Sequence, residues 1–300
     1  MTHRRAVWVM VAAAMMWSIA GVVTRQLDSA RSFEITFWRS GFNALALIAL
    51  LSWLRGPGVL WRTLRDGGRS LWLSGLCWAV MFTAFMLALT LTTVANVLVT
   101  MAIAPLLTAL LSRLVLGHRL ASRTWAAICL AGIGIAWMYG SELGSDGAAG
   151  AGRWLGTVVA MGVPIAAAIN WTLLHHSARS EGEPGDMLPA VLIGGLISAA
   201  LTLPLSLPFA ASAHDLGLLA LLGVVQLAIP CLMAVRASQV LSAPETSLLA
   251  LLEVVFGVAW AWLGAGEAPT TAVLGGGALV LGAMVLNEAF NLRRSTPITS

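Results

Sequence analysis

One acidic residue lies in the interior of a long apolar segment, where an ionisable group is costly. Glu253 follows LLALL and precedes VVFGVAWAW. A carboxylate at that depth in a membrane helix costs about 2.5–3.5 kcal/mol on insertion scales, so it usually faces a polar cavity or a partner. Three roles fit Glu253: a proton site, a contact to a substrate amine, or a neutral group bonded to a neighbouring helix. Because burial penalises the charged form, a proton could bind and leave as a cavity opens to either side.

Uncharged polar side chains in the other apolar segments are better candidates for a substrate pocket. Asn96 and Thr100 are one helical turn apart, and Asn170 and Gln226 lie in two further segments. An amide in lipid needs a partner, so each must face protein, water or ligand. Helix-to-helix bonding is the simpler role for any one of them. Because several of these side chains lie at mid-depth, we nevertheless expect at least one of them to contact substrate.

Aromatic residues could form the walls of the same pocket. Trp78, Phe82 and Phe85 follow one another at spacings of four and three and share one helix face. Trp17 and Trp171 also lie away from the ends of their segments. A pocket wall and lipid-facing packing fit each of these five equally well. Other tryptophans, at segment ends, are interpreted as interfacial anchors.

Arg39 lies five residues after Glu34, near the expected outer surface. It could reach the surface, or pair with Asp28 or Glu34. It could also act as an outer gate or a carboxylate clamp, because its planar fork suits that group.

Three prolines interrupt apolar segments: Pro105, Pro164 and Pro230. Each removes a backbone donor and bends a helix. Two roles are equally consistent with these prolines. They could supply a bend that opens each side of the protein in turn, or a static kink that improves packing.

About ten apolar segments position these residues. Hydrophobic residues make up 59% of the 300-residue chain and charged residues 10%, far less charge than a soluble domain carries. A spanning helix needs about 20 apolar residues, which predicts an all-α polytopic membrane protein. The predicted spans are Ala6–Thr24, Glu34–Leu54, Leu71–Leu91, Val94–Leu116, Arg123–Gly140, Arg153–His175, Leu188–Phe209, Leu216–Leu241, Glu245–Leu263 and Thr270–Phe290.

The chain also contains an internal repeat. The segment from Ala104-Pro105 to Gly117-His118 has a counterpart 149 residues later, from Glu253-Val254 to Gly266-Glu267. Half of ten spans is an odd number, so the two copies must be inverted relative to each other. We therefore expect two inverted five-helix repeats, residues 1–145 and 146–300, joined through the Gly-rich linker 140–152 in one membrane domain.

The basic residues indicate the orientation. All 17 are Arg, and 13 fall on the inner side if the N-terminus is cytoplasmic. This bias predicts a multi-pass protein of the bacterial inner membrane with both termini in the cytoplasm and a retained first helix. Scattered Arg residues exclude a nucleic-acid partner. We expect no cofactor and no metal, and the three cysteines are interpreted as packing residues. The oligomeric state is not determined by the sequence, and a monomer is favoured.

The ten spans and the repeated motif resemble the EamA-type members of the drug/metabolite transporter superfamily. Two departures occur: His118 stands where that family usually has Glu, and Val254 stands where Pro is common. Within the family, the chain is most similar to bacterial exporters of aromatic and other amino acids. The residues that carry the resemblance are Pro105 with Leu116-Gly117-His118-Arg119-Leu120, Leu252-Glu253 with Gly266-Glu267, Trp17-Ser18 and Arg39.

The predicted function is transport by alternating access, without enzymatic activity. The resemblance implies export, and the substrate would be an amino acid or a related small amphipathic metabolite. A multidrug or nucleotide-sugar carrier of the same fold is an alternative. A polytopic enzyme acting on a lipid is another, but the sequence offers no acid/base pair, metal motif or nucleophile with a base nearby. A sensor or scaffold is a third alternative, although the chain has no long soluble output domain.

Overall fold

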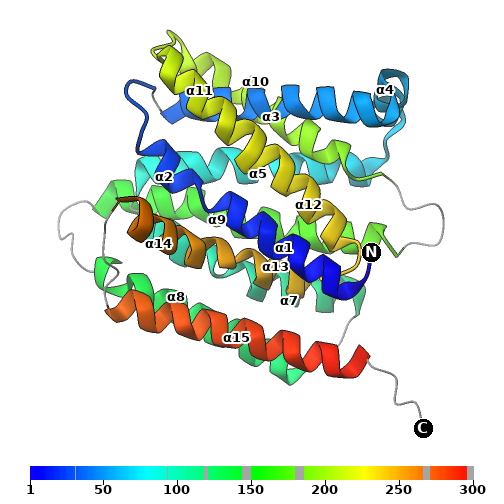
Figure 1. The fold of residues 1–300 in the computed structure, drawn as a ribbon, viewed down its shortest axis with the longest axis vertical. Coiled ribbons are helices and arrows are strands. Elements are labelled where there is room, and N and C mark those ends of the chain that lie inside the picture. The colour runs from blue at the N-terminus through cyan, green and yellow to red at the C-terminus, as the bar shows by residue number, and fades with distance from the viewer. Residues whose placement is uncertain are drawn as a thin grey trace.

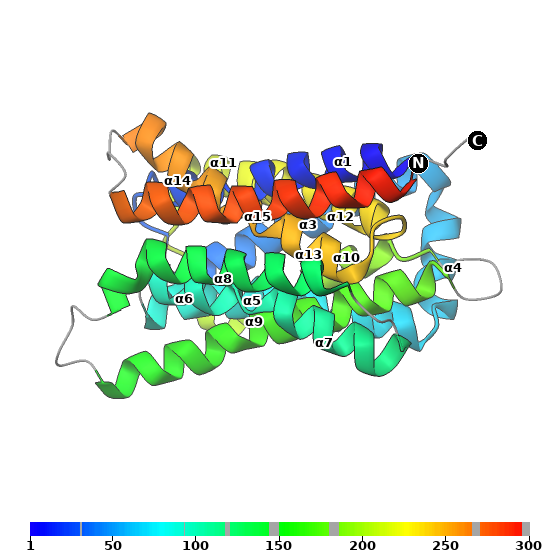
Figure 2. The same ribbon diagram turned by 90° about the horizontal axis from the view of Figure 1, so that it is seen from below.

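The computed structural model describes residues 1–30, 32–92, 94–117, 121–143, 150–179, 186–265 and 271–295. In this part of the chain every regular element is helical, and most helices run side by side along one direction (Figures 1 and 2). The elements are α1 (His3–Trp17), α2 (Ala20–Thr24), α3 (Ser32–Arg55), α4 (Pro57–Asp66), α5 (Arg69–Leu91), α6 (Val94–Met101), α7 (Ala104–Leu116), α8 (Ser122–Leu143), α9 (Gly150–Ser177), α10 (Pro189–Ser206), α11 (Ala213–Leu221), the π-helix η1 (Leu222–Ala228), α12 (Ile229–Ser238), α13 (Ala243–Ala250), α14 (Leu252–Ala265) and α15 (Thr271–Ser295).

Seven helical stretches of the described residues are long and apolar enough to cross a bilayer. Their mean hydropathies run from 1.3 to 2.5, and Ala104–Val115 and Thr271–Ala283 are shorter apolar helices. The protein is therefore a polytopic membrane protein. The seven stretches are His3–Thr24, Phe33–Arg55, Arg69–Ala88, Leu155–Ser177, Pro189–Ser206, Ala213–Ser238 and Ala243–Trp260.

Large apolar side chains point outward. Leu114 is 73% exposed and Leu263 is 75% exposed, whereas Asn43, Ser74 and Ser198 are buried between helices. A water-soluble domain rarely leaves so much contiguous apolar surface uncovered. Lipid is the solvent that suits this outer surface.

The helices pack in pairs that join the two halves of the chain. α3 packs against α10, and α8 packs against α15 along their lengths (Figure 1). α5 contacts both α9 and α10, and α1 contacts α12, α13 and α14. The structure is thus one helical body whose contacts run across the middle of the sequence.

Four predicted spans are interrupted where the sequence predicts single helices. The first breaks at Ser18-Ile19, the fourth at Ala102-Ile103 and the ninth at Leu251, while η1 divides the eighth. Pro105 lies in the first turn of α7, just after the break in the fourth span, where a missing N–H costs little. Pro230 lies just after η1, within the continuous helical stretch Ala213–Ser238. Pro164 is inside α9, as predicted.

Helix α4 is an addition that the ten-span prediction does not contain. Pro57–Asp66 lies at one end of the bundle (Figure 2). It buries Leu60, while Trp61 is 68% exposed and Arg62 and Arg65 lie on the same short helix. This pattern is typical of a helix that lies in the interface between lipid and water.

Candidate substrate cavity

The interrupted helices meet around one cavity of about 120 Å³. Trp17, the last residue of α1, lines it. Met101 and Ala104 line it from either side of the break between α6 and α7, and Leu251 lines it at the break between α13 and α14. Irregular backbone at membrane depth is tolerated where it is buried in protein or lines a cavity, which accounts for the coincidence of the breaks.

Aromatic side chains form one wall of this cavity. The ring of Trp78 packs against that of Phe82 at a centroid distance of 5.6 Å and meets Trp171 edge-on at 5.7 Å. All three line the cavity and are at most 4% exposed. The structure therefore places them in a pocket wall and not against lipid. Such a surface suits a flat apolar group, because aromatic rings favour offset and edge-to-face contacts.

Arg39 and Glu253 are the charged residues among the side chains that line the cavity. Arg39 is 3% exposed, and its Nη2 donates a hydrogen bond to the main-chain oxygen of Phe82 at 3.2 Å. Arg39 is therefore enclosed by the helices and does not reach the surface, as one of its expected roles required. Opposite charges attract strongly where water is excluded, and Arg39 interacts electrostatically with Glu253.

Gln226 connects two of the irregular helices. It lies in η1, and its side-chain nitrogen donates to the main-chain oxygen of Trp17 at 3.2 Å. This bond satisfies a carbonyl at the end of α1 that has no partner within its own helix. The other polar atom of the Gln226 side chain, Oε1, is buried with no hydrogen-bond partner among the described residues. A short π-helix is a frequent feature of functional sites.

Other predicted residues lie outside the cavity lining. Asn170 is buried, and its Oδ1 accepts a hydrogen bond from Ser74 at 2.6 Å, so it joins α9 to α5. Thr100 is buried beside the break in the fourth span without lining the cavity. The side chain of Asn96 lies outside the described residues, as do His118 and Glu267.

Several lining residues are not among the predicted ones. Met81 follows Trp78 at a spacing of three, so helical periodicity could have found it, as it found Phe85, which also lines the cavity. Met101, Val163 and Ser247 also line the cavity, and no local pattern distinguishes them from ordinary apolar helix positions. Cys231, expected only as a packing residue, lines the cavity as well.

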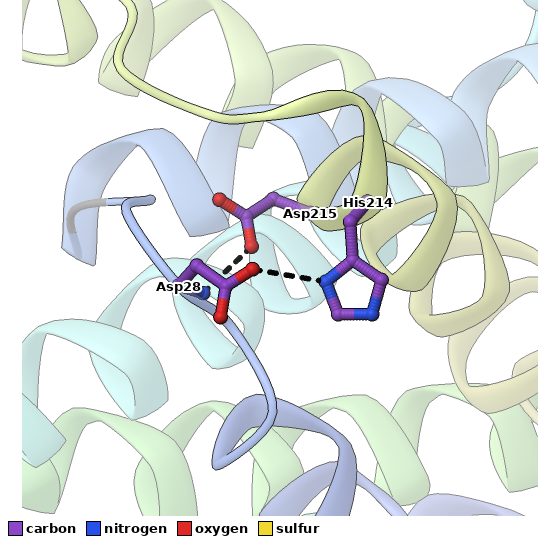
Figure 3. A group of neighbouring side chains, drawn as sticks. All are labelled: Asp28, His214 and Asp215. Atoms are coloured by element: carbon purple, nitrogen blue, oxygen red, sulfur yellow. Dashed lines mark hydrogen bonds and ion pairs between the residues drawn. The ribbon is translucent and has the colours of Figure 1, made fainter.

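A second group of ionisable residues joins two loops at one end of the bundle. Asp28, His214 and Asp215 have potential ligand atoms within 4.8 Å of one another (Figure 3). The two oxygens of Asp215, however, accept five hydrogen bonds, including those from the main-chain N–H groups of Asp28, Ser29 and Ala30. Four of these bonds go to Oδ2 and one to Oδ1, so the Asp215 carboxylate holds the loop.

Glu34 connects the same two loops in the opposite sense. Its carboxylate accepts hydrogen bonds from the main-chain N–H groups of Ala210 and Ala211 at 2.9–3.0 Å. Glu34 lies in the first turn of α3, and Asp215 lies in the first turn of α11. Each helix therefore anchors the loop that leads into the other. These residues are 181 positions apart, so no local sequence pattern could have revealed the pair.

Comparisons with known proteins agree with this architecture. The EamA-like transporter family matches residues 4–140. No curated protein matches the chain. Twenty-eight chains of solved structures do match. One crystal structure superposes with a TM-score of 0.77 over 98% of this chain and 100% of its own, at 19% identity, which shows a shared fold. Residues 4–140 are therefore similar to EamA-like transporters, and this likeness points to a membrane transporter of the drug/metabolite superfamily.

Proposed function

We propose that this protein is a secondary transporter that moves amino acids or related small amphipathic metabolites across the bacterial inner membrane by alternating access, in the direction of export. The observation that carries the proposal is the cavity itself. Its lining combines two charged residues, Arg39 and Glu253, with an aromatic wall at Trp78 and Trp171, and it lies between interrupted membrane helices. The likeness to EamA transporters fits a protein without enzymatic activity.

Helix packing supports two inverted five-helix repeats, residues 1–145 and 146–300. The contact between α5 and α9, the third and sixth spans, has a counterpart in the contact between α1 and α12, the first and eighth spans. The contact of α7 with α9 likewise has a counterpart in the contacts of α1 with α13 and α14. Exchanging spans one to five with spans six to ten reproduces each of these pairs, as a two-fold arrangement requires.

The positions of the helix breaks fit the same proposal. The break at Ala102 and the one at Leu251 are separated by the 149 residues that separate the two copies of the sequence motif. Broken helices at a repeat interface near the bilayer midplane are typical of carriers. We infer that these breaks are where the helices bend as access alternates, with a monomer as the transporting unit.

Cavity size and charge favour a small metabolite over the alternative substrates. Drug-sized ligands bind in pockets of about 300–1,000 Å³, and this cavity measures about 120 Å³. A nucleotide sugar brings two phosphate charges, whereas Arg39 is the one cation among the described residues of the lining. An amino acid with an apolar side chain matches both the volume class and the charges.

Counterflow in reconstituted vesicles tests the proposal. Protein-containing vesicles loaded with an unlabelled neutral amino acid should take up the labelled one saturably without ATP. The same vesicles without internal amino acid should not take it up. Ala167→Phe, which places a ring in the cavity lining on α9, should abolish counterflow. Val158→Phe, on the same helix where the side chain is 56% exposed, should leave it intact. Absence of counterflow across a broad screen, with folded protein in the vesicles, would overturn the proposal.

A further inference from the structure

We infer that a second cavity, beside helix α4, binds the headgroup of a phospholipid that carries one phosphate and one primary amine. The cavity measures about 600 Å³, and no described lining residue is common to it and the central cavity. Its walls are α4, the first turn of α5, the end of α9, and Asp186 and Met187, which lie before α10. The inference does not depend on which solute the protein transports.

Helix α4 places this cavity at the depth of lipid headgroups. In Figure 2, α4 crosses one end of the bundle, whereas the spanning helices run along its length. Leu60 is buried, while Trp61 is exposed beside Arg62. Tryptophan favours the boundary between lipid and water, and arginine keeps its charge on the water side. A phospholipid that lies against α4 therefore has its headgroup level with the cavity.

The apolar surface next to the cavity suits the acyl chains of such a lipid. Leu71 lines the cavity, and the next two residues of α5, Trp72 and Leu73, are half-exposed. At the end of α3, which contacts α4, Trp53 and Leu54 are exposed as well. A soluble ligand would use none of this surface, which favours a lipid as the occupant.

Arg62 and Asp66 give the cavity one charge of each sign. They lie one helical turn apart on α4, and both line the cavity. Among the described residues neither forms an ion pair, and the Nε atom of Arg62 donates to the main-chain oxygen of Gly58 at 3.2 Å. A basic residue four positions before an acidic one is the less favourable order for pairing on a helix. Both charges are therefore available to a ligand.

The first turn of α5 strengthens the attraction for a phosphate. Gly68, which precedes the first residue of α5, and Ser70, in the first turn, both line the cavity. Main-chain N–H groups at the start of a helix have no partner within the helix and attract anions. A Cβ atom at Gly68 would meet nothing within 4 Å, so the space in front of this turn is open. The guanidinium of Arg62 completes the phosphate site, because its planar fork matches phosphate oxygens.

Asp66 decides which phospholipid fits. The other acidic residue of the described lining, Asp186, is paired with Arg55. An ethanolamine headgroup supplies Asp66 with an ammonium that has three N–H donors. A choline headgroup has no N–H donor, and a glycerol headgroup leaves the carboxylate without a counter-charge. The site therefore favours phosphatidylethanolamine.

A bound headgroup joins the two halves of the chain at this end of the bundle. Arg62 and Asp66 belong to the first half, whereas Ser177, at the end of α9, and Asp186 belong to the second. A ligand that binds the folded protein and not the unfolded chain raises the melting temperature. Phosphatidylethanolamine is therefore expected to stabilise the protein.

Thermal unfolding of the delipidated protein in detergent tests the inference. Three lipids with the same dioleoyl chains are added separately: phosphatidylethanolamine, phosphatidylcholine and phosphatidylglycerol. We expect the ethanolamine lipid to give half of its maximal rise in melting temperature at a concentration about fivefold lower than either other lipid, the factor that one partly exposed charge pair contributes. Equal concentrations for the three lipids, or a preference for choline or glycerol, would overturn the inference.

Substitutions on α4 locate the effect. Arg62→Gln should weaken the response to all three lipids, and Asp66→Asn should remove the preference for ethanolamine over glycerol. Arg65→Gln, on the same helix but outside the described lining, is the matched control and should keep the wild-type response. All three side chains are exposed, so the variants are expected to fold. A wild-type preference in Asp66→Asn, or the same loss in Arg65→Gln as in Arg62→Gln, would overturn the site.

Glycerophosphoethanolamine, which has the same headgroup without acyl chains, separates a lipid from a soluble ligand. It should raise the melting temperature only at concentrations far above those of the lipid, because the apolar surface beside the cavity stays uncovered. An equal effect of the two compounds at equal concentration would overturn the lipid as the occupant.

Discussion

The side-chain nitrogen of Gln226 donates a hydrogen bond to the main-chain oxygen of Trp17 at 3.2 Å. The bond joins the π-helix of the eighth span to the end of the first helix, and both residues line the cavity. It therefore couples the backbone irregularity of one half of the chain to that of the other.

Replacing Gln226 with Leu should weaken solute binding. The change removes the donor and leaves the Trp17 oxygen unsatisfied beside the cavity, at a cost of about 1–3 kcal/mol. We expect the half-saturation concentration in counterflow to rise by about tenfold, with a lower melting temperature in detergent. Gln239→Leu, at the exposed C-terminal cap of α12, should change neither quantity. Equal behaviour of the two variants would show that the bond is dispensable.

Replacing Gly194 with Ala should disturb the aromatic wall. A Cβ atom at this position would lie 2.4 Å from the Cβ atom of Trp78, closer than two carbon atoms can approach. We expect α10 and α5 to separate, with a loss of both thermal stability and transport. Gly217→Ala has open space around it and should be neutral or slightly stabilising, since Ala favours a helix. A Gly194→Ala protein with wild-type stability and transport would contradict the close packing.

Replacing Asp215 with Asn should destabilise the loop between the first two spans. The amide nitrogen cannot accept the hydrogen bonds that an ionised carboxylate oxygen receives, and hydrogen bonds to a charged group are stronger than those between neutral groups. We expect a drop of several degrees in the melting temperature. Asp28→Asn, whose side chain is 72% exposed and faces His214, should have a much smaller effect. Similar losses for both variants would mean that the exposed ion pair, and not the buried carboxylate, holds the loop.

Glu253→Gln should show whether solute exchange can be separated from coupling to a proton gradient. The variant keeps the size of the side chain but cannot titrate. If Glu253 carries the coupling proton, vesicles containing this variant should still exchange the transported amino acid but should no longer accumulate it under an imposed pH gradient. Asp28→Asn, in the exposed loop after the first span, should retain the gradient response of the wild type. An unchanged response in Glu253→Gln would rule out the proton role.

Labelling of single cysteines should establish the orientation. In a protein without its native cysteines, a cysteine in place of Ser145 should react with an impermeant reagent in whole cells. One in place of Ser180 should react only after the membrane is opened. Both positions lie outside the described residues, so this prediction rests on the distribution of Arg residues. The opposite labelling pattern would invert the orientation and exclude cytoplasmic termini.

Sequence reasoning identified much of the cavity lining because two of its signals are local. These are the energetic cost of a polar side chain in an apolar segment and the periodicity of a helix face. Glu253 and Gln226 are conspicuous in apolar segments, and Trp78 and Phe82 share a face. The same reasoning could not tell Gln226 from Asn170, since the partner of each is set by helix packing and Asn170 meets Ser74. The breaks at Ser18 and Leu251 carry no proline within them. They depend on long-range contacts, such as the hydrogen bond that Trp260 donates to Ser18.

The exchange of anchors between Glu34 and Asp215 has a consequence for how the protein is made. Ribosomes deliver the first five spans to the membrane before Ala210 and Ala211 exist, so Glu34 initially lacks two main-chain donors that it has in the finished protein. The loop after the first span likewise waits for Asp215. We expect the first half, expressed alone, to be degraded rapidly and to be rescued by co-expression of the second half.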